Sequence, residues 1–252
     1  MAVLAAVAPA ATAQPLTVAA ASDLQTVLPA IAARFERETA TPVRLTFGSS
    51  GNFFGQIENG APFDLLLSAD IDYPRALIDK GKADATSLYV YAVGQLVLWS
   101  RDLDVSGGLP VLAGAAVTRV AIANPAHAPY GRAAMAALKN AGVLASVQPK
   151  LVLGENVSQA AQFAQSGNAQ AGLIALSLAR SPGLNRGRFV AIPATLHPPI
   201  VQAAVVVSAS PHKAAAARFL EFLRRDATVA ELADAGFLKP SGDEALPWTG
   251  QR

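Results

Sequence analysis

Two hydrophobic periods alternate along this 252-residue chain, and this alternation constrains the fold more than any other feature. Short apolar runs, typical of buried strands, are followed by segments with apolar residues every three or four positions, typical of helices. Strands that alternate with helices indicate a parallel α/β sheet. The strand-like runs are 15–21, 42–47, 63–68, 95–100, 119–123, 150–153, 171–176, 189–192 and 201–207, and the helical segments include 23–38, 131–141, 157–165, 212–224 and 227–235.

These elements are compatible with one large sheet or with two doubly wound domains, because periodicity does not report the order of strands in a sheet. The segments near residues 89–95 and near residue 200 are candidates for crossings between two lobes. In that arrangement the first lobe is discontinuous and consists of residues 15–91 plus 202–252, while residues 92–201 form the second lobe.

The first fourteen residues, MAVLAAVAPAATAQ, do not have the pattern of a folded element. They are apolar and end in Ala11-Thr12-Ala13, which fits the small-x-small cleavage site of a secretory signal peptide. The stretch lacks the positive start of such a signal, so a disordered tail is the alternative. We expect residues 1–14 to be a signal-peptide remnant and the mature protein to be periplasmic.

Composition argues against several classes of function. The chain has no cysteine, which excludes disulfides and thiolate metal sites. The net charge is +2, and the basic residues are scattered in short pairs such as Arg224-Arg225, whereas a nucleic-acid surface normally clusters them. We therefore expect no nucleic-acid partner. The three histidines, His127, His197 and His212, have no metal-ligand spacing.

Support for catalysis is weak. The sequence has no G-x-S-x-G elbow, no phosphate-binding loop of the Walker type and no G-x-G-x-x-G fingerprint. A hydrolase that used Ser22 or Ser50 would need a base, and His127 is the one plausible partner from the loops. We expect a protein that is not an enzyme and needs no cofactor, with a phosphoester-processing enzyme as the disfavoured alternative.

Polar residues gather where strands end and helices begin, which is where ligands bind in open α/β sheets. Free N–H groups and a partial positive charge at helix N-termini hold oxyanions without Lys or Arg, and Ser hydroxyls add further donors. Each junction separately also fits an ordinary helix cap or turn. Their shared placement favours one anion site, built from AASDL at 20–24, FGSSGN at 47–52, NPAHAPYGR at 124–132 and GENVS at 154–158.

Asp23 admits two interpretations. In the one that we favour, its carboxylate stabilises the first turn of a helix and points away from the cleft. In the other, the carboxylate faces the ligand and accepts its proton, which favours hydrogen phosphate over a fully ionised oxyanion such as molybdate or sulfate. Asp23 therefore keeps phosphate as an alternative ligand, and sulfate is a further alternative as another oxyanion.

Several segments together resemble the periplasmic molybdate-binding proteins (ModA type) of ABC transporters, from about residue 16 to about residue 238. The resemblance implies an α/β fold of the type II periplasmic-binding-protein class, with two doubly wound lobes, a hinge and a ligand cleft between them. It also implies delivery of the ligand to an ABC permease of the inner membrane, and we expect the protein to be a monomer. The segments are AAASDL, FGSSGNFFGQIENGAPFDLLLSAD, YAVGQLVLWS, IANPAHAPYGRAAMAAL, GENVSQAAQF and GNAQAGLIALS.

The same resemblance implies the ligand contacts, carried over by motif. Ser22 and Ser50 would give hydroxyl and amide donors, Asp23 and Val157 their amides, and Tyr130 its phenol or amide. The ligand bound as an oxyanion would be molybdate or tungstate, which are too similar in size to be separated. The shorter bonds of sulfate would leave some hydrogen bonds stretched.

One position departs from part of this family. Some members have a tyrosine at the end of the strand that here has the sequence Gly172-Leu173-Ile174-Ala175, and Ala175 has no phenol. This chain resembles the branch with a tyrosine in the A-P-Y-G loop, so we expect Tyr130 to take that role.

A ligand-sensing domain of a transcription regulator shares the fold and is the remaining rival. Such a regulator carries a helix-turn-helix before the domain, whereas here a leader-like stretch precedes the first strand, and this argues against the rival.

Overall fold

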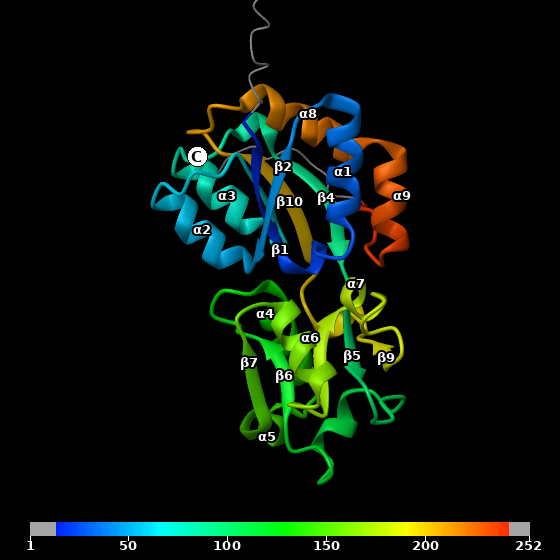
Figure 1. Ribbon diagram of the computed structural model, residues 1–252. Helices are drawn as coiled ribbons and strands as arrows, with labels where there is room; N and C mark the ends of the chain where they lie inside the picture. Colours follow the sequence, from blue (N-terminus) through cyan, green and yellow to red (C-terminus); the bar gives the residue numbers. More distant parts are fainter. Residues whose placement is uncertain (1–13, 242–252) are drawn as a thin grey trace, which may run out of the picture.

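The computed structural model describes residues 14–241 and shows two α/β lobes, each built around a five-stranded sheet (Figure 1). Residues 1–13 of the expected leader lie outside the described residues. Within residues 14–241, no helix is long and apolar enough to cross a membrane.

The first sheet has the strand order β2-β1-β3-β10-β4 and is mixed. Strand β1 is parallel to β2 and β3, as the alternation of strands and helices predicts, but β10 is antiparallel to β3 and β4. The expectation of a parallel sheet is therefore wrong for β10, because this strand returns from the second lobe and enters the sheet from the opposite end. The strands are β1 (Leu16–Ala21), β2 (Val43–Gly48), β3 (Leu65–Ser68), β4 (Tyr89–Gly94) and β10 (Ile200–Val206).

Helices cover both faces of the first sheet. On one face, Phe35 of α1 contacts Phe219 and Phe222 of α8 edge to face, with ring centroids 5.0 and 5.4 Å apart. Such aromatic pairs contribute about 0.5–1.5 kcal/mol beyond the burial of their area. On the other face, Phe53 and Leu77 belong to a second apolar cluster under α2 and α3. The helices are α1 (Leu28–Thr39), α2 (Ser50–Glu58), α3 (Asp72–Asp79), α8 (Lys213–Arg224) and α9 (Asp226–Asp234).

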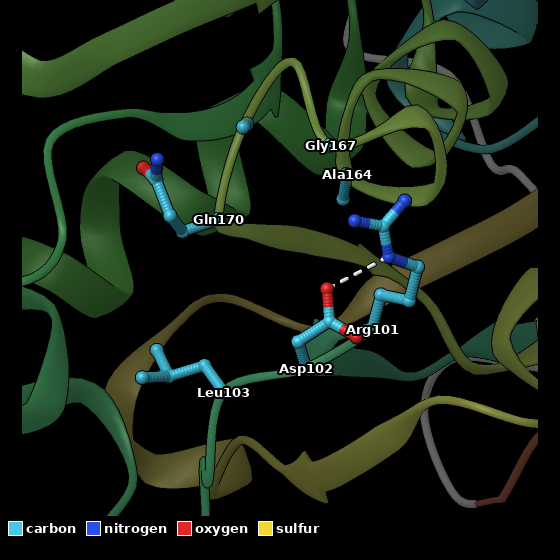
Figure 2. A pocket seen from close by; sticks show the side chains of 7 residues that line it. Arg101, Asp102, Leu103, Ala164, Gly167 and Gln170 are labelled. Atoms are coloured by element: carbon cyan, nitrogen blue, oxygen red, sulfur yellow. Dashed lines mark hydrogen bonds and ion pairs between the residues drawn. The ribbon is translucent and has the colours of Figure 1, made fainter.

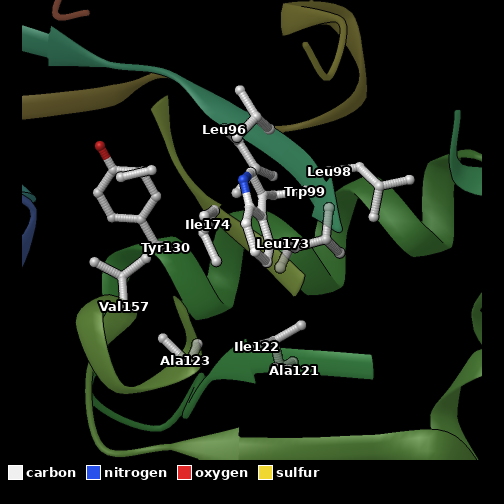
Figure 3. Close-up of a cluster of buried hydrophobic side chains, with 14 of the residues drawn as sticks. Leu96, Leu98, Trp99, Ala121, Ile122, Ala123, Tyr130, Val157, Leu173 and Ile174 are labelled. Carbon is white, nitrogen blue, oxygen red and sulfur yellow. The ribbon is translucent and has the colours of Figure 1, made fainter. Parts of the chain in front are cut away.

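The second sheet has the order β7-β6-β8-β5-β9, with β6 parallel to β7 and β8, and β5 antiparallel to β8 and β9. Its core contains Leu98, Trp99, Ile122 and Leu173 (Figure 3). The strands are β5 (Leu96–Ser100), β6 (Val120–Ala123), β7 (Leu151–Gly154), β8 (Ala171–Ala175) and β9 (Arg188–Ala191), and the helices are α4 (Pro129–Asn140), α5 (Leu144–Val147), α6 (Val157–Ser166) and α7 (Leu176–Ala179).

Candidate functional site

A small cavity lies between the two lobes, beyond the carboxyl ends of β1, β2, β3, β6 and β7. The cavity volume is about 10 Å³, which is small. It is lined by Ala21, Ser22, Asp23, Gly48, Ser49, Ser50, Ala69, Ala128, Pro129, Tyr130, Asn156 and Val157.

The structure brings all five residues named from the sequence to this one cavity. Ser22, Asp23 and Ser50 come from the first lobe, and Tyr130 and Val157 come from the second. All five are buried, with exposed fractions of at most 4%. Residues that are far apart in the sequence thus surround a single enclosed space.

Helix α2 begins at the cavity. Ser49 caps the helix, because its Oγ accepts a hydrogen bond of 3.3 Å from the amide of Asn52. The Oγ of Ser50 accepts a bond of 2.9 Å from the amide of Ala69, so its own hydrogen stays available for donation. First-turn amides have no acceptor inside a helix, and the amide of Ser50 is not used by these capping bonds.

Helix α6 also begins at the cavity. Asn156 caps it, with Oδ1 accepting a bond of 3.0 Å from the amide of Gln159. The amide of Ser158, the second residue of the helix, donates across the lobes to the Oγ of Ser22 at 3.4 Å. The first-turn amide of Val157 is left beside the cavity as a donor.

Helix α4 begins with Pro129, which has no N–H and suits the first helical position. Gly131 lets the helix start directly against the end of β6, since a Cβ on Gly131 would lie 2.1 Å from the carbonyl oxygen of Ala123. The first amide of α4 therefore belongs to Tyr130. Figure 3 shows Tyr130 and Val157 at the edge of the apolar cluster, with the Tyr130 hydroxyl directed away from it.

The Asp23 carboxyl differs from the favoured expectation, because it is fully buried between the lobes and does not point away from the cleft. Its Oδ2 accepts a bond of 3.0 Å from the Tyr130 hydroxyl and a short bond from Nε2 of Gln202. Oδ1 is buried without a hydrogen-bond partner. Burial raises the pKa of Asp23 to about 6, although the bonds from Gln202 and Tyr130 act in the opposite direction.

Gln202 is a site residue that the sequence analysis missed. It is the one amide side chain in the otherwise apolar strand β10, IVQAAVV, and it is fully buried. A lone polar residue in a buried strand requires hydrogen-bond partners, so the signal was present in the sequence. Its Oε1 accepts a bond of 2.8 Å from the Tyr91 hydroxyl, which directs its Nε2 toward Asp23.

The donors around the cavity are electrically neutral. No Lys or Arg is among the lining residues, and the described part of the chain contains no group of three metal-ligating side chains. Ala175 is buried but does not line the cavity. The partial positive charges of three helix N-termini thus supply the attraction for an anion.

Contacts at the rim hold the lobes together. Nδ1 of His127 lies 2.9 Å from Oγ of Ser49, which belongs to the other lobe. Arg132 of α4 forms an ion pair with Asp70 and donates to the Tyr73 hydroxyl at 2.9 Å. These contacts join the two lobes at the rim of the cavity.

Another cavity lies at the far end of the second lobe (Figure 2). The guanidinium of Arg101 there donates to the carboxylate of Asp102 at 2.8 Å, and the two side chains are 52% and 75% exposed. Gly167, at the C-terminal end of α6, also lines it. This cavity lacks the convergent helix N-termini of the interlobe site.

Comparison with known proteins places the chain among binding proteins. A family model for bacterial extracellular solute-binding proteins matches residues 16–238. The chain is 40% identical over 194 residues to the molybdate-binding protein ModA of Rhodobacter capsulatus, covering 77% of this chain and 76% of the relative. It is 39% identical over 219 residues to ModA of Azotobacter vinelandii, covering 85% and 86%. The solved structure of the Azotobacter vinelandii periplasmic molybdate-binding protein matches with a TM-score of 0.83 at 35% identity, over 90% of this chain and 100% of that one.

Proposed function

Since this chain belongs to the family of bacterial extracellular solute-binding proteins, we propose that it captures molybdate or tungstate and delivers the anion to an ABC importer. The family consists of transport proteins and not of enzymes, and the anion is cargo and not a cofactor. The family is extracytoplasmic, and we place this member in the periplasm, as a monomer that docks on an inner-membrane permease.

One observation carries the proposal: helix N-termini from both lobes converge on a closed cavity without basic side chains. We assign donation to the anion to the hydroxyls of Ser22 and Ser50 and to the amides of Asp23, Ser50, Tyr130 and Val157. Hydrogen bonds to a charged group contribute about 1.5–3 kcal/mol each, so such a set suffices for tight binding.

We also propose that the lobes close on the anion as two bodies, residues 15–91 with 202–252 and residues 92–201. Support comes from the sheets, because β4 belongs to the first sheet through Gly94 and β10 from Ile200 onward. The crossings then lie at Gln95 and in residues 192–199, within a few residues of the expected boundaries. Hinge closure about two crossings is a common motion of binding proteins.

Calorimetric titration of anion-free protein with molybdate, tungstate, sulfate and phosphate tests the proposal. We expect molybdate and tungstate to bind one to one, and sulfate and phosphate to give no measurable heat. A preference for phosphate or sulfate would contradict the assignment, and so would the absence of binding by all four anions.

The substitution Arg132→Gln is expected to weaken molybdate binding by about 2- to 5-fold. Its bonds to Asp70 and Tyr73 join the lobes, so their loss destabilises the closed form, and partly exposed ion pairs contribute about 0.2–1 kcal/mol. The weaker affinity should appear mainly as faster dissociation of molybdate. Arg225→Gln is the matched control, because it breaks an ion pair with Glu38 inside the first lobe. Equal effects of the two substitutions would refute this role of Arg132.

A further inference from the structure

The Asp23 carboxyl is an unusual neighbour for an anion site. It is fully buried, it lines the cavity, and it forms no ion pair within residues 14–241. An ionised carboxylate beside a doubly charged oxyanion is strongly disfavoured in such surroundings, because two like charges share one buried site.

The hydrogen bonds of Asp23 treat its two oxygens differently. Oδ2 accepts from both the Tyr130 hydroxyl and Nε2 of Gln202, whereas Oδ1 has no partner. The Gln202 amide is oriented by the Tyr91 hydroxyl, which donates to Oε1 at 2.8 Å and lies 3.2 Å from the carbonyl oxygen of Ser68. A proton on Asp23 therefore belongs on Oδ1, since Oδ2 already faces two donors.

We propose that Asp23 takes up one proton when the lobes close on the anion, and that Oδ1 then donates a hydrogen bond to a fully deprotonated oxyanion. This inference rests on the proposed function and adds the Asp23 side chain to the ligand shell. The proton moves from the solvent to Asp23, and the oxyanion neither gains nor loses one. Asp23 thereby couples the kind of anion to its own protonation state, because a fully deprotonated oxyanion needs a proton from Asp23 whereas hydrogen phosphate brings its own.

The groups that face Asp23 are consistent with this assignment. They are the phenols of Tyr130 on α4 and Tyr91 on β4, the neutral amide of Gln202 on β10, and the backbone amides of Asp23 and Leu24. Burial raises the pKa of both phenols well above the ordinary value, so they stay protonated. Burial also raises the pKa of Asp23 itself to about 6, and an anion in the cavity raises it further.

The sign of the pH dependence follows from these shifts. A raised carboxyl pKa favours the protonated form, so binding that requires the proton is strongest at low pH and weakens as pH rises. Molybdate stays fully deprotonated at neutral and alkaline pH, so it does not contribute to the trend there. We expect the affinity for molybdate to fall by up to ~10-fold per pH unit between about pH 6.5 and about pH 8.5.

The test is calorimetry with the intact protein and molybdate, in buffers of different ionisation enthalpy at about pH 7.5. The dependence of the observed heat on buffer enthalpy counts protons, and we expect uptake of about one proton per anion. Molybdate binding with no proton uptake and a flat pH profile would overturn this inference and leave the proposed function standing. No molybdate binding at any pH would overturn the proposed function as well.

Two variants assign the proton to a residue. Asp23→Asn cannot take it up, so proton uptake and the pH dependence should both disappear, whatever the affinity of the variant. His127→Gln removes a titratable side chain at the rim of the cavity and should retain proton uptake. Uptake that survives in Asp23→Asn, or that disappears in His127→Gln, would overturn the assignment. Should Asp23→Asn fail to fold, as judged by thermal unfolding, the buffer series on the unsubstituted protein still decides the proton count.

Discussion

Replacing Val157 by proline is expected to weaken molybdate binding by roughly 10- to 100-fold while the protein stays folded. Val157 is the first residue of α6, and proline is well tolerated at that position. Asn156 before it has an extended backbone, with φ −150° and ψ 175°, which suits a residue that precedes proline. The substitution therefore removes one N–H group from the cavity, and a hydrogen bond to a charged group contributes about 1.5–3 kcal/mol.

Two controls separate the lost amide from other effects of this substitution. Val157→Ala shortens a buried side chain but keeps the N–H, so its loss of affinity should be much smaller than that of the proline variant. Asp226→Pro places proline at the first residue of α9, after Arg225 with φ −63° and ψ 140°, far from the cavity. Calorimetric titration of the three variants with molybdate measures these differences in affinity. A Val157→Pro variant that binds like the unsubstituted protein would show that this amide is not a ligand.

Gly131→Ala is expected to lower the free energy of unfolding by at least roughly 2 kcal/mol, the upper part of the range for overpacked sites. The new Cβ would lie 2.1 Å from the carbonyl oxygen of Ala123 and 2.9 Å from the backbone nitrogen of Pro125. Both atoms belong to the backbone, so relief requires a shift of α4 against β6. Because Tyr130 precedes this glycine, anion affinity should fall as well.

Gly55→Ala is the matched substitution in another helix. A Cβ on Gly55 meets nothing within 4 Å, so alanine should stabilise α2 by about 0.5–1 kcal/mol through its higher helix propensity. Chemical denaturation of both variants measures the difference. If both substitutions changed the free energy of unfolding in the same direction, the close contacts around Gly131 would not limit stability.

Most of the candidate site could be predicted from the sequence. The junctions at strand ends marked the four segments that line the cavity, because ligand sites in α/β sheets lie beyond strand ends and at helix N-termini. The family resemblance implied the individual contacts within these segments, Tyr130 among them. Gln202 was missed, although an amide inside an apolar strand is a visible signal.

The sequence by itself determined most of the strands and helices and the polar junctions between them, because hydrophobic periodicity and helix capping are local properties. It did not predict strand β4, whose residues were expected to form a crossing between lobes. Only the tertiary structure decided that β5 and β10 run antiparallel to neighbouring strands, because strand direction depends on where the chain crosses between lobes. It alone decided the environment of Asp23 too. The contacts of that carboxyl with Tyr130 and Gln202 join residues 107 and 179 positions away, and burial between two lobes cannot be inferred from local pattern.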